Sequence, residues 1–467
     1  MKTLVIRSAV VAAVGGLIFG FDTAVISGAE EQIQAQFGLS DALLGFTVTT
    51  ALIGTIIGAL AAGKPADRYG RKKVLYVIGV LYVIGAIGSA LAPNVEVLMI
   101  FRFLGGLGVG ASSVCAPIYT AEIAPPANRG KLVGLVQFNI VLGILVAYAS
   151  NAIIRSIVTE DHAWRWMLGV MVVPAVIFLL LLPTVPETPR WLAADGQWDA
   201  AEETSQRLCT TPAEADAQMG EIRASLAAAE NSPNVPFFTR GHARVIMLAV
   251  AIAFFNQMSG INAILYYAPR VMQEAGATAN AAYLMSIAVG AMNLIATMLA
   301  LTVIDRLGRR TLMIVGSIGY LISLGFLTGV MFYYENAPGG FTGTSSALVL
   351  IGLMVFIAAH AFGQGSVIWV FISEIFPNRI RGRGQSLGSL THWVFAAITS
   401  FAFPPIIGAF GGGVAFSIFF VAMIGQLVWV LKVMPETKGV PLEEMEARLG
   451  LTHDPNDTED PLAAKGH

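Results

Sequence analysis

DRYGRK at residues 67–72 and DRLGRR at residues 305–310 are two copies of one motif, and each copy lies between two long apolar segments. A second pair keeps a similar spacing, since AEIAPPANRG at 121–130 matches SEIFPNRIRG at 373–382 with the glutamates 252 residues apart. A third pair, PETPR and PETKG, is separated by 249 residues. Duplication of about half the chain within a membrane predicts a solute carrier whose site lies between the two halves.

The composition indicates a membrane protein. Hydrophobic residues make up 55% of the 467 residues and charged residues 12%, against roughly 45–50% and about 25% in soluble domains. The mean hydropathy is +0.70, so we expect a lipid bilayer as partner. A formal net charge of −2 gives no reason to expect nucleic acid. Two cysteines offer no disulfide framework.

Twelve apolar runs have the length of about 20 residues that crosses about 30 Å of hydrocarbon. No water satisfies backbone groups there, so the runs must be helices, and we predict an all-α membrane protein with two six-helix halves. The first run follows Lys2 and Arg7 like a secretory signal, but its glycines and aspartate favour a retained helix. The predicted spans are 8–28, 42–63, 72–92, 96–120, 132–154, 165–184, 243–268, 281–304, 311–333, 346–374, 386–409 and 413–434.

Basic residues predict the orientation. If both termini are cytoplasmic, 24 of the 28 Lys and Arg residues fall on the cytoplasmic side. We therefore expect a multi-pass protein of the cell membrane, which in a bacterium is the inner or plasma membrane, with both termini in the cytoplasm. The expected units are an N-terminal six-helix bundle at 1–189, an intracellular helical linker at 190–240, a C-terminal six-helix bundle at 241–434, and a cytoplasmic helix and tail at 435–467.

The sequence lacks the motifs of several classes of enzyme and metal site. It contains no GxxxxGK[ST] phosphate-binding loop, and its six histidines form no HExxH motif. No close Cys/His cluster indicates a metal site. An intramembrane hydrolase would need a nucleophile and a base, and Ser112 and Ser113 have no recognisable partner. We therefore expect no enzyme activity, no metal and no cofactor.

Two charged residues lie inside predicted spans. Asp22 is in the middle of FGFDTAVISG, where a carboxylate costs about 2.5–3.5 kcal/mol. Arg102 is the single basic residue that lies away from the ends of a predicted span. We expect the two to pair, so that protonation of Asp22 releases Arg102 and couples proton entry to a conformational change. The alternative is a permanent structural ion pair.

The repeated motifs place acids and bases at the cytoplasmic ends of helices. Glu122 with Arg129, and Glu374 with Arg381, are natural partners, and such pairs would hold the inner face closed. Positive-inside topology signals are the alternative explanation. The predicted charge gate consists of Asp67, Arg71, Glu122, Arg129, Glu187, Asp305, Arg309, Arg310, Glu374, Arg381 and Glu436.

Several longer motifs follow one another along nearly the whole chain. They include GGLIFGFDTAVISG (15–28), GKPADRYGRKK (63–73), YTAEIAPPANRGKLVGLVQ (119–137), VPETPRWL (185–192), NQMSGINAILYYAP (256–269) and SVIWVFISEIFPNRIRGRG (366–384). As a set they resemble the sugar porter family of the major facilitator superfamily. The resemblance implies the major facilitator fold, and it matches Asp22 and Arg102 to the pair implicated in proton coupling.

The resemblance also implies a monosaccharide held between the halves. Amide side chains offer donors and acceptors to hydroxyls, and tryptophan faces stack on the apolar side of a sugar ring. The implied sugar contacts are Gln137, Gln257, Asn262, Tyr266, Asn293, Gly365, Trp369 and Trp393.

Four positions depart from the family pattern. Asn256 replaces the first Gln of a usual QQ pair, and His392 replaces an Asn or Gln beside Trp393. Both are expected to line the sugar site, and His392 is a hydroxyl ligand, a titrating group or a space filler. Ser366 stands where Pro is usual, which softens a helix break. Met171 stands where one type of symporter has a second titratable Glu, so coupling would depend on Asp22 alone.

The leading hypothesis is a proton-coupled importer of a monosaccharide such as glucose, xylose or galactose, working by alternating access as a monomer. Its partners are a small-molecule sugar and protons. A passive facilitator of the same sugars, a symporter of a polyol such as myo-inositol and a non-transporting sugar receptor are the alternatives. The substrate stays open because such pockets differ by single hydroxyls.

Overall fold

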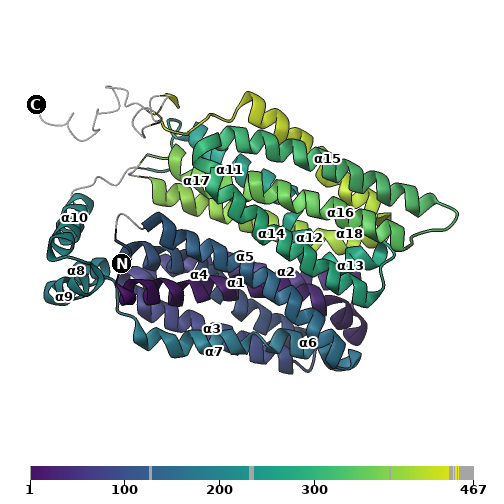
Figure 1. Cartoon of the computed structure of the whole chain (residues 1–467), viewed down its shortest axis with the longest axis horizontal. Helices are drawn as coiled ribbons and strands as arrows, with labels where there is room; N and C mark the ends of the chain where they lie inside the picture. Colours follow the sequence, from purple (N-terminus) through teal and green to yellow (C-terminus); the bar gives the residue numbers. More distant parts are fainter. Residues whose placement is uncertain are drawn as a thin grey trace, which may run out of the picture.

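The computed structural model consists of helices lying in two bundles side by side (Figure 1). It describes residues 2–125, 129–230, 236–377 and 380–440, together with positions 445, 448, 449 and 451. Within these residues there is no strand, and eleven helices are long and apolar enough to cross a membrane. The predicted helix in the tail lies almost entirely outside the described residues.

The N-terminal bundle contains six spans, the sixth of which is interrupted after Gly169. Its helices are α1 (Thr3–Phe37), α2 (Asp41–Tyr69), α3 (Arg71–Leu91), α4 (Val95–Ile123), α5 (Arg129–Ile157), α6 (Glu160–Gly169), α7 (Val172–Leu181) and η2 (Leu182–Thr184).

The C-terminal bundle repeats this plan with two interrupted spans. Its helices are α11 (Ala243–Met258), α12 (Ile261–Tyr266), α13 (Ala268–Glu274), α14 (Ala279–Leu307), α15 (Arg309–Asn336), α16 (Gly343–His360), the π-helical turn η3 (Ala361–Gly365), α17 (Ser366–Ile375) and α18 (Arg381–Lys432).

The α18 helix contains two spans. Its 52 residues would extend about 78 Å at 1.5 Å per residue, more than twice the thickness of the hydrocarbon core. Gly411 has φ 82° and ψ 170°, which no other residue adopts easily, and there the chain turns back. The twelve spans and the all-α class predicted from the sequence are thus confirmed.

Glycines allow the helices within a half to approach closely. A Cβ atom at Gly20 of α1 would collide with the carbonyl oxygen of Ile140 on α5. Gly106 of α4 lies in the same way against the carbonyl of Ala51 on α2. Small residues at such crossings increase van der Waals contact between helices in lipid, where the hydrophobic effect contributes little.

The two halves contact each other at the end of the molecule away from the N-terminus, which we call the far end. There α14 packs on α5 and α18 packs on α2. The Tyr148 hydroxyl donates to the carbonyl of Leu265 over 2.7 Å, and the Tyr283 hydroxyl donates to the carbonyl of Gly28 over 2.6 Å. These bonds cross from one half to the other.

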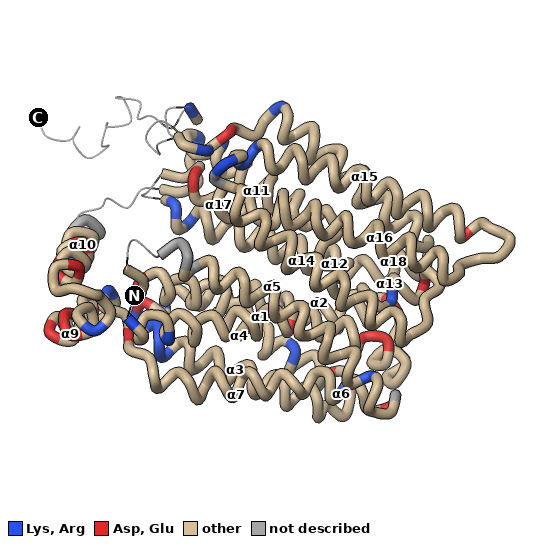
Figure 2. Tube along the Cα trace, in the orientation of Figure 1, with Lys and Arg blue, Asp and Glu red and all other residues tan. Residues whose placement is uncertain are grey.

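The opposite end, which carries the N-terminus, is the termini end. Lys and Arg gather there (Figure 2). The linker forms three short helices at this end, α8 (Pro189–Ala194), α9 (Trp198–Leu208) and α10 (Pro212–Glu230), which pack around Trp191 and Met219.

Candidate functional site

A buried ion pair lies in the N-terminal half, between α1 and α4. Arg102 Nη1 donates to Asp22 Oδ1 over 2.6 Å, and each residue is 5% exposed. Arg102 Nε has no hydrogen-bond partner among the described residues. A cavity of about 10 Å³ beside the pair, lined in part by Ser89 and Met171, is large enough for one water molecule. Tyr266 of α12 is also 5% exposed.

Amide side chains meet where Gly260 separates α11 from α12. Gly260 has φ 85°, and a Cβ atom there would lie 2.5 Å from the Phe419 ring, so this break requires glycine. Asn262 Nδ2 donates to Gln257 Oε1 over 3.0 Å, and Gln257 Nε2 donates to Asn256 Oδ1 over 2.9 Å. All three amides are buried. The break therefore aligns side chains of two helices in one hydrogen-bonded row.

Aromatic rings border this row. Gln257 Nε2 lies 3.2 Å from each ring nitrogen of His392. The His392 ring centroid is 5.2 Å from that of Trp369 and 4.9 Å from that of Trp393, which in turn is 5.8 Å from Phe19 of the other half. Amides beside aromatic faces suit a ligand with both hydroxyl groups and an apolar face.

The other predicted contact residues are not bonded to this row. Asn293 Oδ1, on α14, accepts a hydrogen bond from Thr297 of the same helix over 3.5 Å. Gln137 is half-buried on α5. Gly365 ends η3, where a Cβ atom would lie 3.2 Å from the carbonyl oxygen of His360.

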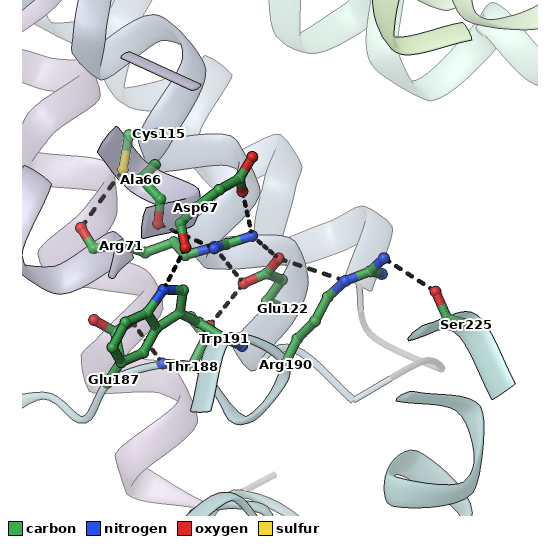
Figure 3. A network of polar contacts seen from close by, with 10 residues as sticks. All are labelled: Ala66, Asp67, Arg71, Cys115, Glu122, Glu187, Thr188, Arg190, Trp191 and Ser225. Carbon is green, nitrogen blue, oxygen red and sulfur yellow. Dashed lines mark hydrogen bonds and ion pairs between the residues drawn. The ribbon is translucent and has the colours of Figure 1, made fainter. Parts of the chain in front are cut away.

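Arg71 is the centre of a polar network at the termini end of the N-terminal half (Figure 3). Its guanidinium contacts both carboxylate oxygens of Glu122 at 3.0 Å and Asp67 at 3.1 Å. Thr188 Oγ1 donates to Glu122 over 2.7 Å. Glu187 accepts a backbone N–H of the first turn of α3 over 2.9 Å, and burial raises the pKa of Glu187 above its usual value.

The C-terminal half contains the same network a second time. Arg309 donates to both oxygens of Glu374 over 2.8 Å and 3.0 Å, and Thr437 Oγ1 donates to Glu374 over 2.6 Å. Glu436 accepts the backbone N–H groups of Arg309 and Arg310 at the start of α15. The duplication in sequence is therefore also a duplication of contacts.

One expected pairing is wrong. Glu374 pairs with Arg309 rather than Arg381, because the first turn of α15 packs against α17. Two guanidinium nitrogens of Arg381 are buried without a hydrogen-bond partner among the described residues. The side chains of Arg129 and Asp305 lie outside what the structure describes. Each network stays within its own half, and in the described part of the chain no hydrogen bond or ion pair joins the halves at the termini end.

Arg270 of α13 joins the halves at the far end. It contacts Glu30 and Gln34 of α1 at 3.4 Å and 3.0 Å, Asp41 of α2 at 3.3 Å, and Glu274 of its own helix at 3.3 Å. Glu30 is 1% exposed. Burial raises the pKa of Glu274 above its usual value, and Arg270 offsets only part of that effect. Three carboxylates thus share one guanidinium in the far-end cluster of Arg270, Glu30, Asp41 and Glu274.

The chain matches a known family over most of its length. The model of the family described as "Sugar (and other) transporter" matches residues 8–449. The chain belongs to this sugar transporter family. It is 37% identical to the D-xylose-proton symporter of Escherichia coli (strain K12), covering 94% of each chain. It is 36% identical to the arabinose-proton symporter of Bacillus subtilis (strain 168), covering 93% of each chain.

Solved structures show the same architecture. The structure described as the partially occluded inward open conformation of the xylose transporter XylE from E. coli has a TM-score of 0.82 at 34% identity, with 94% of this chain and 100% of that chain covered. The chain therefore shares the major facilitator fold over 94% of its length.

The far-end cluster was missed from the sequence. In the sequence, Arg270 is a lone basic residue just after the predicted span 243–268, and no motif distinguishes it. The signal available was the Arg270 to Glu274 spacing of four residues, which places the two on one helix face. The partners of Arg270 on α1 and α2 lie more than 220 residues away in the chain. No local sequence pattern therefore reveals them.

Proposed function

We propose that this chain imports a monosaccharide together with a proton across the bacterial inner membrane, with both termini in the cytoplasm. The observation that carries the proposal is the buried 2.6 Å pair of Asp22 and Arg102, in a chain similar to a D-xylose-proton symporter along 94% of its length. Residues 1–189 and 241–434 act as the two moving halves, and a single chain is sufficient.

Asp22 is the proton-binding group in this proposal. Charged Asp22 holds Arg102, and a buried pair that loses one charge leaves the other uncompensated. Protonation therefore frees Arg102 to move. The adjacent cavity, which has room for one water molecule, offers the proton a polar step toward Asp22. A Met at position 171 supplies no second titrating group there.

The sugar is bound mainly by the C-terminal half. Asn256, Gln257, Asn262 and His392 supply donors and acceptors from α11, α12 and α18, and Trp369 and Trp393 supply ring faces. A site built from hydrogen bonds rejects analogues that lack a hydroxyl far better than an apolar pocket does. Pentoses and hexoses are therefore the proposed substrates, and a polyol such as myo-inositol is the second candidate.

The structure supports an inward-facing arrangement for this mechanism. Hydrogen bonds and ion pairs join the halves at the far end, and the described residues include none at the termini end. In the proposed cycle the far-end cluster separates to admit sugar from outside. The termini ends of the two halves, which carry the networks of Arg71 and Arg309, then come together to close the inner side.

Proteoliposomes test the proposal. Purified protein under an imposed inward proton gradient should accumulate D-xylose or D-glucose above the outside concentration. A facilitator would only equilibrate the sugar, and that result would refute symport. A thermal-shift panel of pentoses, hexoses and cyclitols identifies the substrate, because a ligand that binds the native state raises its melting temperature.

A companion variant tests Asp22. Asp22→Asn mimics the protonated carboxyl, so sugar accumulation should disappear while counterflow exchange stays within about twofold of wild type. Met171→Leu is the control, because it lines the same cavity without charge and should keep accumulation. Retained accumulation in Asp22→Asn would show that the pair is only structural.

A further inference from the structure

A single row of side-chain hydrogen bonds runs from the proposed sugar site through the C-terminal half. Asn262, Gln257 and Asn256 form its first part, as described above. Asn256 Nδ2 then donates to Gln364 Oε1 over 3.4 Å, and Gln364 Nε2 donates to Gln426 Oε1 over 2.8 Å. The row thus leaves the site and enters the interior of the bundle.

The row ends on the backbone of α15. Gln426 Nε2 donates to Ser317 Oγ over 2.8 Å, and the Ser317 hydroxyl donates to the carbonyl of Met313 over 2.7 Å. A carbonyl can only accept. Because the Ser317 proton is used there, Gln426 must present its N–H to Ser317, and every amide before it must point the same way.

All six side chains of the row are buried. Gln257, Gln364, Gln426 and Ser317 are each 0% exposed, Asn256 is 2% exposed and Asn262 is 8% exposed. Gln364 lies in the η3 turn, at a place where Gly363 and Gly316 bring the backbones of η3 and α15 together, with a Cβ at Gly316 falling 2.8 Å from the Gly363 Cα. Gln364, Gln426 and Ser317 are therefore enclosed by the bundle and support the end of the row at the proposed sugar site.

The direction of the row has a consequence for Gln257. Asn256 gives its N–H to Gln364, so its oxygen is left to accept from Gln257. Gln257 therefore presents nitrogen to Asn256 and His392 and oxygen to Asn262. Reversal of one amide would set N–H against N–H on one side and oxygen against oxygen on the other, and such buried groups without a hydrogen-bond partner are unfavourable.

We propose that Gln364, backed by Gln426 and Ser317, is a positioning residue that fixes which way the amides of Asn256 and Gln257 face the sugar. This inference rests on the proposed function, since it assumes that these amides bind substrate. All six side chains belong to the C-terminal half, on α11, α12, η3, α15 and α18. The row therefore sets sugar affinity without contributing to the Asp22 and Arg102 pair.

Two serines of α15 provide a matched test. Ser317 accepts from Gln426, whereas Ser323 bonds only carbonyls of its own helix, and both are buried. Ser317→Ala and Gln364→Met should raise the Kd and the KM for sugar about tenfold, with kcat within about twofold. Ser323→Ala should leave all three unchanged. Accumulation at saturating sugar should persist in every variant.

Binding is measured by titrating D-xylose and D-glucose into each purified variant, and melting temperatures show whether it is folded. If wild type binds and Ser317→Ala and Gln364→Met bind equally tightly, the positioning role is wrong while the proposed function stands. An equal loss in Ser323→Ala would also overturn it, since packing alone would explain the effect. If wild type binds and transports no sugar, the proposed function itself fails. If Gln364→Met does not fold, the serine pair decides.

Discussion

Single residues define the chemistry of the site. A lone charged side chain such as Asp22 or Arg102 is energetically unfavourable inside a bilayer. The structure pairs the two, with 2.6 Å between Arg102 Nη1 and Asp22 Oδ1. His392 is the residue whose role the sequence left open. In the structure, His392 lies between Gln257 and the rings of Trp369 and Trp393. It can therefore contribute to sugar binding through its ring nitrogens or through the shape of its ring.

Two substitutions separate these roles of His392. His392→Gln keeps a hydrogen-bonding group near Gln257, and we expect the sugar KM to stay within about threefold. His392→Phe keeps a ring against Trp369 and Trp393 but leaves the Gln257 amide short of a partner, and the KM should rise about tenfold. Sugar uptake kinetics measure both. The opposite ranking would make His392 a space filler.

At the scale of helices, glycine decides how closely neighbours approach. Gly20 faces the backbone of α5, whereas Gly134 of α5 has no atom within 4 Å of the place where a Cβ would lie. Interrupted helices matter equally. The break at Gly260 lets Asn262 of α12 reach Gln257 of α11. In a straight helix, residues 256 and 262 would lie about 120° apart around the axis.

The glycine pair gives a stability prediction. Gly20→Ala should destabilise the protein by about 1–3 kcal/mol, because α1 and α5 must move apart. Gly134→Ala meets nothing and removes a flexible residue from a helix, so it should be neutral or stabilising by up to about 1 kcal/mol. Thermal unfolding in detergent, followed by intrinsic fluorescence, compares the two. Equal melting temperatures would mean that the close approach contributes nothing.

For the whole molecule, the contacts that join the two halves decide which end of the molecule is closed. Glu30, Asp41 and Glu274 surround Arg270, and Glu31 lies beside them, accepting from Gln273 over 2.8 Å. This far-end cluster carries more negative than positive charge. Its protonation must therefore depend on whether the halves are together or apart.

The pH dependence follows from Glu274. Its pKa is raised in the closed arrangement and returns toward its usual value when solvent enters. Protonation of Glu274 therefore stabilises the closed far end. This stabilisation is complete below the usual pKa of a glutamate, and it is lost as the pH rises through the raised pKa of Glu274. Distances between spin labels at the exposed positions 42 and 280 should shorten on acidification. Glu274→Gln should reduce the change in distance with pH, although the other carboxylates of the cluster remain. A pH response equal to that of wild type would contradict the assignment.

Much of the fold could be predicted because lipid imposes strong local rules. Twelve apolar stretches, the repeated DRxGR motif and the order of the longer motifs were sufficient for the architecture and the family. The sequence also predicted that spans eleven and twelve are separate. In the structure both belong to α18, and the chain turns between them at Gly411. The roles of the individual sugar and proton residues remain predictions.

The sequence by itself determined the helices, the duplication and the identity of the two charges buried in the N-terminal half, because apolar length and rare charges are local properties of the chain. Only the tertiary structure decided that Glu374 pairs with Arg309, that Arg270 meets α1 and α2, and that six polar side chains donate in one direction toward Met313. Those contacts join segments dozens to hundreds of residues apart. Their partners are set by how the helices cross, and no spacing along the chain encodes that geometry.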